Sequence, residues 1–274
     1  MKRPDNNMGS SSLEDRKRRK VGAFAAAIAL LLGAGACRKA TTTPSNRTLP
    51  YPIADPLSEA DKFYSGRQDL MNVRRAIVTL RQAQASDPSN YDLAWRLAKF
   101  NYYLAAHSPD GTEKDKAFRD GIEAGKLAVQ LQDGKPDGHF WLGANYGGSA
   151  QTSTLAGLSE VEDIKGEMET VLKLDAAYQS GSAYMVLGEV YLKSPSILGG
   201  DTQKAIEYLE KGLRLGPDNA LLRLHLAKAY VDAHRNEDAR KQINALLTMK
   251  PAPGYEPEYN EAVAEAYKLQ EKLK

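Results

Sequence analysis

Few side chains in this sequence are placed to do chemistry. The chain has one cysteine, Cys37, and four histidines, at positions 107, 139, 225 and 234. None of them has the His-x-x-x-His or Cys-x-x-Cys spacing of a zinc site, and no Gly-x-Ser-x-Gly elbow is present. The sequence therefore predicts no metal, no cofactor and no enzyme active site. The reactive group that remains is the Cys37 thiol.

Cys37 ends an N-terminal segment that has the features of an export signal. A basic cluster at 16–20 is followed by an uncharged apolar run at 21–36. A membrane-spanning helix needs about 20 apolar residues. This run is therefore short for a permanent anchor, but it suits the apolar part of a secretory signal peptide. We expect residues 1–36 to be a signal peptide that is cleaved before Cys37.

Two processing reactions fit the residues around this cysteine. The run Ala34-Gly35-Ala36-Cys37 is similar to the lipobox of bacterial lipoproteins, in which the thiol is acylated, although Ala34 stands where Leu is usual. Ala34 and Ala36 also fit a plain signal-peptidase site. Acylation is favoured, because a lone thiol in an exported protein has no disulfide partner. Arg38 after the cysteine resembles outer-membrane sorting, so we expect a periplasmic lipoprotein anchored there, or a secreted protein if Cys37 is not acylated.

A spacer separates the cysteine from the helical part of the chain. Residues 37–56 are rich in Thr, Pro and Ser and have no helical periodicity. This composition is typical of a flexible tether, which would let an anchored domain stand off the bilayer.

The charge balance excludes one class of partner. The first 20 residues hold seven of the 37 Lys and Arg side chains but three of the 35 Asp and Glu side chains, so the rest of the chain is slightly acidic. Nucleic acid is therefore not an expected partner.

A repeated pattern indicates the fold. A Leu followed by a small residue recurs at intervals of 45, 45 and 39 residues, with the small residue at 98, 143, 188 and 227, and in the last three of these copies a Tyr follows three positions later. Each copy lies in a helical pattern. Such a repeat is typical of a solenoid in which each unit buries its apolar face on its neighbour.

Each of these first helices is followed by a second one that ends at a turn signal. The turns lie near Pro88, Pro136, Asp175, Pro217 and Pro251, and the last two prolines are 34 residues apart. These are features of the tetratricopeptide repeat. We therefore predict an all-α superhelix of about four to five helix pairs over 57–274, with a C-terminal helix.

In such an array the first helices line an inner face. Its side chains fall three before, one after and four after the small residue, which is one helical stripe. Most members of this stripe are apolar or aromatic, and the candidate ligand or partner groove consists of Trp95, Lys99, Tyr102, Phe140, Met185, Glu189, Leu192, Leu224 and Lys228.

Three uses of this inner face stay open. It could be a closed core, covered by the C-terminal segment 258–274 through Tyr259, Val263, Tyr267 and Leu269. It could be a channel for an apolar ligand. It could also be a groove for a partner protein.

The central part of the chain resembles a known family. The runs PDGHFWLG at 136–143, YMVLGEVY at 184–191, SILGGD at 196–201 and AIEYLEKGL at 205–213 are similar to the T component of TRAP transporters (TatT), a group of periplasmic tetratricopeptide lipoproteins. The SILGGD insertion is the most specific of them. The resemblance implies an accessory protein that partners a periplasmic solute-binding protein or another envelope protein and passes a hydrophobic small molecule.

The leading hypothesis is therefore a lipid-anchored, non-enzymatic transporter accessory. The alternative is a scaffold for envelope complexes that has a filled core and no small-molecule ligand. The sequence leaves open whether the protein forms homo-oligomers.

Overall fold

The computed structural model describes residues 55–152 and 154–273, and all described residues belong to the compact unit Tyr51–Lys274. The predicted signal peptide, Cys37 and most of the predicted tether lie outside the described residues. None of the helices in the described ranges has both the length and the apolar character needed to cross a bilayer.

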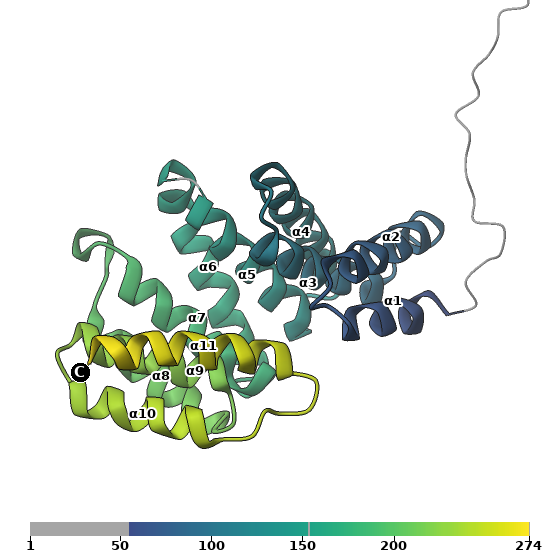
Figure 1. Ribbon diagram of the computed structural model, residues 1–274. Coiled ribbons are helices and arrows are strands. Elements are labelled where there is room, and N and C mark those ends of the chain that lie inside the picture. Colours follow the sequence, from purple (N-terminus) through teal and green to yellow (C-terminus); the bar gives the residue numbers. More distant parts are fainter. Residues whose placement is uncertain (1–54, 153, 274) are drawn as a thin grey trace, which may run out of the picture. The chain divides into compact units, whose positions relative to one another are not determined.

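The described ranges contain helices and no strands, and the helices form five successive pairs followed by a final helix (Figure 1). The pairs are α1 (Pro56–Ser65) with α2 (Leu70–Ser86), α3 (Tyr91–His107) with α4 (Gly111–Leu131), α5 (Pro136–Thr152) with α6 (Thr154–Leu174), α7 (Tyr178–Lys193) with α8 (Thr202–Leu215), and α9 (Ala220–Asp232) with α10 (Asn236–Thr248); the final helix is α11 (Glu256–Lys272), and a short 3₁₀ turn, η1 (Ser196–Leu198), precedes α8. The predicted all-α superhelix is confirmed.

Short polar side chains fix where the helices start. An Asp or Asn side chain at the N-cap accepts a hydrogen bond from a backbone N–H of the first turn, which satisfies one of the donors that the helix leaves unpaired. At the start of α8, the Asp201 side chain accepts from the Lys204 N–H at 3.0 Å. The other such caps in the described ranges are Asp55, Asp69, Asn90, Asp110 and Asn219.

The small residues of the repeat bring the two helices of a pair close together. A Cβ atom added at Gly143 would lie 2.5 Å from Met168 Cε on α6, and one added at Gly188 would lie 2.7 Å from Leu209 Cγ on α8. Ala98 and Ala227 are fully buried at the equivalent positions. Large side chains from the second helix therefore fill the space above each small residue.

The glycine-rich run after Tyr146 is helical, since α5 continues through Thr152. The reason is a close contact with α4, because a Cβ atom added at Gly148 would lie 2.1 Å from Cε1 of Phe118. The glycine makes room for this ring, and the packing offsets the low helix propensity of the run.

Gly181 has to be glycine for two reasons. Its φ angle is +74°, and a Cβ atom there would lie 2.6 Å from the Gly212 carbonyl oxygen on α8. By contrast, Gly166 on α6 is exposed, and nothing lies within 4 Å of an added Cβ atom.

We predict that Gly181→Ala lowers the free energy of unfolding by about 2 kcal/mol or more, because the left-handed backbone and the carbonyl contact both oppose a side chain. Gly166→Ala is the matched control. It should raise stability by up to about 1 kcal/mol, since alanine favours a helix interior. Urea titrations of the two variants measure both values, and equal stability for the two would contradict the packing described for α7 and α8.

Candidate functional site

The predicted inner-face residues fall into an N-terminal and a C-terminal group. Trp95, Tyr102 and Phe140 belong to the larger hydrophobic cluster, which residues of α1 to α8 build. Met185 and Leu224 belong to the smaller cluster of the C-terminal helices, and Leu192 packs against both clusters.

Burial along this stripe is uneven. Phe140 is 5% exposed and Leu224 is 3% exposed, so both are core residues. Trp95, Tyr102 and Met185 are half-buried, as is Leu192. The stripe is therefore a filled core at two positions and a partly open wall at the others.

Aromatic rings form most of the wall near α3 and α5. The Tyr102 ring centroid lies 5.7 Å from that of Trp141 and 6.4 Å from that of Phe118. Phe140 meets Trp141 edge-on at 4.9 Å and Tyr178 at 5.3 Å. Burial raises the pKa of the Tyr102 hydroxyl to about 12, so this hydroxyl stays neutral.

Lys99 is an ammonium group held among these rings. Its Nζ lies 5.0 Å from the centroid of Tyr64 and 5.6 Å from that of Trp141, which is cation–π geometry. Burial, and after it the charge of Arg67, lowers the pKa of Lys99. Within the described residues Lys99 forms no ion pair. It can therefore meet a polar or anionic group of a bound molecule.

Glu189 forms an ion cluster in the same stripe. Its Oε1 lies 2.6 Å from His225 Nδ1 and 3.3 Å from Lys193 Nζ. Burial opposes ionisation, but the contacts with His225 and Lys193 outweigh it and hold the pKa of the Glu189 carboxyl at about 2. His225 is thus the hydrogen-bonding partner of a carboxylate.

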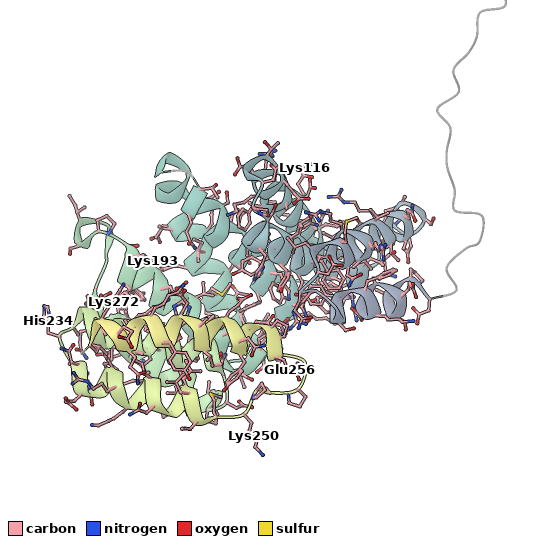
Figure 2. All side chains as sticks on the ribbon, viewed as in Figure 1. Lys116, Lys193, His234, Lys250, Glu256 and Lys272 are labelled. Carbon is pink, nitrogen blue, oxygen red and sulfur yellow. The ribbon has the colours of Figure 1, made fainter. Side chains whose placement is uncertain are left out.

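The C-terminal helix lies along the inner face. In Figure 2, Glu256 and Lys272 mark the two ends of α11. The negative charge of Glu258 partly offsets the lowering of the Lys99 pKa, and that of Glu261 helps to raise the pKa of Tyr102. The positive charge of Lys228 helps to lower the pKa of Glu265. Spacings of three and four residues place these three carboxylates on one side of a helix.

The apolar side of α11 packs on α9 and α10. Ala262, Ala266 and Leu269 are buried there. Tyr259 is half-buried and its hydroxyl donates to the Met249 carbonyl oxygen at 3.0 Å, whereas Tyr267 is 56% exposed. The sequence therefore placed the helix correctly, but Tyr267 is not among its packing residues.

Three long-range contacts tie the start of α11 to the first helix pairs. Arg67, which follows α1 and is 6% exposed, donates from Nε and Nη2 to the two carboxylate oxygens of Glu258 at 3.0 and 2.6 Å. Arg67 Nη2 also donates to the Gly254 carbonyl oxygen at 2.6 Å. His107 Nε2 lies 2.9 Å from Glu261 Oε1. We call Arg67, His107, Glu258 and Glu261 the clasp.

Sequence reasoning missed the clasp. Its partners are 191 and 154 residues apart, and no local spacing marks either pair. The bidentate Arg67 contact is the strongest geometry that a guanidinium and a carboxylate can form. It joins the two ends of the repeat array across the inner face.

No metal centre is indicated in the part of the chain that the structure describes. There, no three His, Cys, Asp or Glu side chains lie close enough together to hold an ion. The buried His139 is instead held by its neighbours, with Nδ1 2.6 Å from Glu167 Oε2 and Nε2 2.8 Å from the Asp133 carbonyl oxygen.

A family model matches the central part of the chain. The chain belongs to the TRAP transporter T-component family, whose model matches residues 101–258, more than half of its length. This is the family that the sequence motifs indicated. The match begins within α3 and ends at the start of α11.

The fold is similar to that of a solved TPR protein. A thermophilic TPR protein from Thermus thermophilus is 20% identical with a TM-score of 0.56, and the match covers 78% of this chain and 97% of that one. A structure of pilF from Pseudomonas aeruginosa is also 20% identical, with a TM-score of 0.48, and covers 80% of this chain and 94% of that one. No curated protein matches in sequence.

We predict that Glu258→Gln lowers the free energy of unfolding by about 3 kcal/mol, because it leaves the buried Arg67 guanidinium without its countercharge. Glu265→Gln is the matched control on the same helix. Its pair with Lys268 is exposed, and such pairs contribute little. Chemical denaturation measures both variants, and a loss no greater for Glu258→Gln than for the control would show that the clasp does not hold α11.

Proposed function

We propose that this protein is the lipid-anchored accessory component of a TRAP-type transporter and that its inner face receives an apolar molecule. The family assignment supports an accessory role in transport rather than catalysis. The half-open aromatic wall around Trp95 and Tyr102 supports an apolar ligand, since such walls favour apolar surfaces. The partner on this proposal is a periplasmic solute-binding protein.

The observation that carries the proposal is the arrangement around Lys99. The rings of Tyr64 and Trp141 lie against an ammonium group that has no ion-pair partner in residues 55–152 or 154–273, and Tyr102 packs on the same Trp141 ring. An apolar body could pack on the rings while a polar end meets the ammonium. The clasp and α11 would keep water away from such a ligand.

The alternative function is a scaffold for envelope complexes. The nearly complete burial of Phe140 and Leu224 favours it, because these two stripe positions already have protein neighbours. On this alternative the half-buried positions would contact a partner protein.

A ligand test separates the two functions. Protein purified from the envelope of its native cells, and freed of detergent, should release a stoichiometric apolar compound when it is extracted with organic solvent and analysed by mass spectrometry. Lys99→Met and Tyr102→Ala should reduce the yield at least tenfold while the protein stays folded. Lys250→Met is the control, because Lys250 is an exposed residue after α10. An empty wild-type preparation would overturn the ligand proposal and favour the scaffold.

The proposed anchor has its own test. Cells that express the full chain with labelled palmitate should yield labelled protein in the outer-membrane fraction, and Cys37→Ala should abolish the label. The label would be lost because the thiol is the acceptor for the lipid. A wild-type protein that stays unlabelled and is found free in the periplasm would show that the leader is cleaved without acylation.

A further inference from the structure

One of the four repeat copies lacks its aromatic residue. Tyr146, Tyr191 and Tyr230 stand three positions after the small residue of their helix, and Asn101 stands there in the first copy. In the last copy the Tyr230 ring is buried, and its hydroxyl donates to Glu210 Oε1 on α8 at 2.7 Å. In this copy the repeat therefore places a phenol ring between two consecutive helix pairs.

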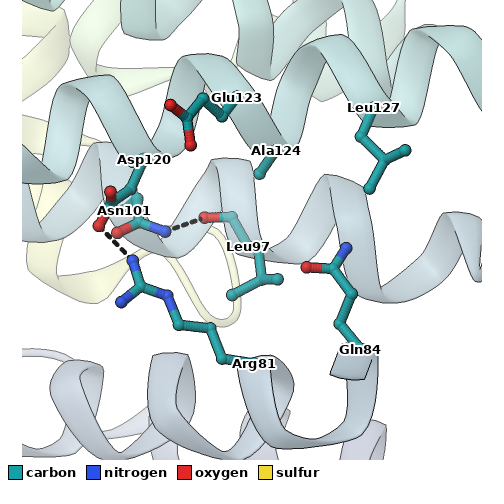
Figure 3. Close-up of a pocket in the computed structure, with 8 residues that line it drawn as sticks. All are labelled: Arg81, Gln84, Leu97, Asn101, Asp120, Glu123, Ala124 and Leu127. Carbon is teal, nitrogen blue, oxygen red and sulfur yellow. Dashed lines mark hydrogen bonds and ion pairs between the residues drawn. The ribbon is translucent and has the colours of Figure 1, made fainter. Parts of the chain in front are cut away.

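A pocket of about 320 Å³ opens at Asn101 (Figure 3). It lies between α2, α3 and α4 and is lined by Arg81, Gln84, Leu97, Asn101, Asp120, Glu123, Ala124 and Leu127. A smaller pocket of about 230 Å³ lies between α8, α9 and α10, where Tyr230 is present.

The two pockets occupy the same place in the repeat. Arg81, Gln84, Leu97 and Asn101 are each 129 residues before Glu210, Leu213, Leu226 and Tyr230, which line the smaller pocket. The pocket is larger where the repeat has asparagine. The repeat therefore indicates what this space is shaped to hold, since a phenol ring occupies the equivalent position.

The lining suits a ring with one polar end. Leu97, Ala124 and Leu127 provide the apolar part. At the polar part Arg81 pairs with Asp120, as the dashed line in Figure 3 shows. Arg81 stands where Glu210 binds the Tyr230 hydroxyl in the other pocket.

Two amide groups add hydrogen-bonding capacity. Asn101 is 2% exposed, and its Nδ2 donates to the Leu97 carbonyl oxygen at 2.8 Å, as Figure 3 also shows. Gln84 Nε2 is a buried donor that has no acceptor among the described residues. Buried donors are nearly always paired in proteins, so an unpaired one at a pocket wall indicates a missing acceptor. A phenol oxygen can supply it.

We propose that this pocket is a binding site for the phenol ring of a ligand, with the ring on Leu97, Ala124 and Leu127 and the hydroxyl between Arg81 and Gln84. The ring would take the place that the Tyr230 ring takes in the last repeat. The source of the phenol is either a small aromatic compound or a tyrosine side chain. This site is separate from the inner face and does not depend on the function proposed for it.

Titration of the full-length protein with 4-methylphenol tests the site. The side-chain amide signals of Asn101 and Gln84 in ¹⁵N–¹H NMR spectra should shift in a saturable manner, and toluene, which lacks the hydroxyl, should bind at least tenfold more weakly. N-acetyl-tyrosinamide is the second arm. Saturable shifts with both phenols assign the site to a tyrosine side chain, and shifts with 4-methylphenol alone assign it to a small phenol. The absence of shifts with either compound would overturn the proposal.

Two variants give an independent check. Asn101→Tyr should fill the pocket from within, raise the melting temperature and weaken 4-methylphenol binding at least tenfold. Gln84→Leu copies Leu213 of the equivalent pocket, and it should weaken 4-methylphenol binding several-fold while leaving toluene binding unchanged. The second variant keeps the test decisive if Asn101→Tyr fails to fold. Unchanged 4-methylphenol affinity in a folded variant of either kind would place the ligand elsewhere.

Discussion

The structure depends on the close approach of the two helices in each pair. Gly143 and Gly188 leave space that Met168 and Leu209 fill, and a Cβ atom at either glycine would clash with these side chains. A pair packed in this way still exposes an apolar face, which a further pair has to cover. The superhelix follows from this one local constraint, applied in each repeat.

In the described part of the chain, the last helix pair has no further pair to cover its apolar face, and α11 covers it instead. Its buried alanines and Leu269 cover the last pair, while its exposed side carries charged residues such as Lys268. The same helix also reaches back to the first pairs through the clasp. The inner face is therefore bounded by an aromatic wall on the first helices and by carboxylates on α11, so it combines apolar surface with a few fixed charges.

The two candidate sites differ in how they relate to the repeat. Lys99 stands at a stripe position that is also charged in two later copies, at Glu189 and Lys228, but it is the copy that lies over aromatic rings. Asn101 stands where the later repeats have tyrosine, and a pocket opens beside it. In a repeat protein the residues shared by all repeats build the fold. A residue that departs from the repeat pattern is not needed for that packing and is therefore available for binding.

The amino-acid sequence alone was enough to establish the helices, their order and the family. These features follow from local signals that can be recognised along the chain: the spacing of Leu and small residues, the Asp and Asn residues that cap helices, and the prolines that end them. Each signal acts within a few residues. Three other features were decided by three-dimensional packing. Phe140 is buried in the core whereas Met185 is half-buried, and α5 continues through Gly148. Arg67 binds Glu258, which is far away in the sequence. These outcomes depend on which side chains from distant helices fill a given space. Helical periodicity predicts the side of the helix on which a side chain lies, but it does not predict which residue of another helix packs against it.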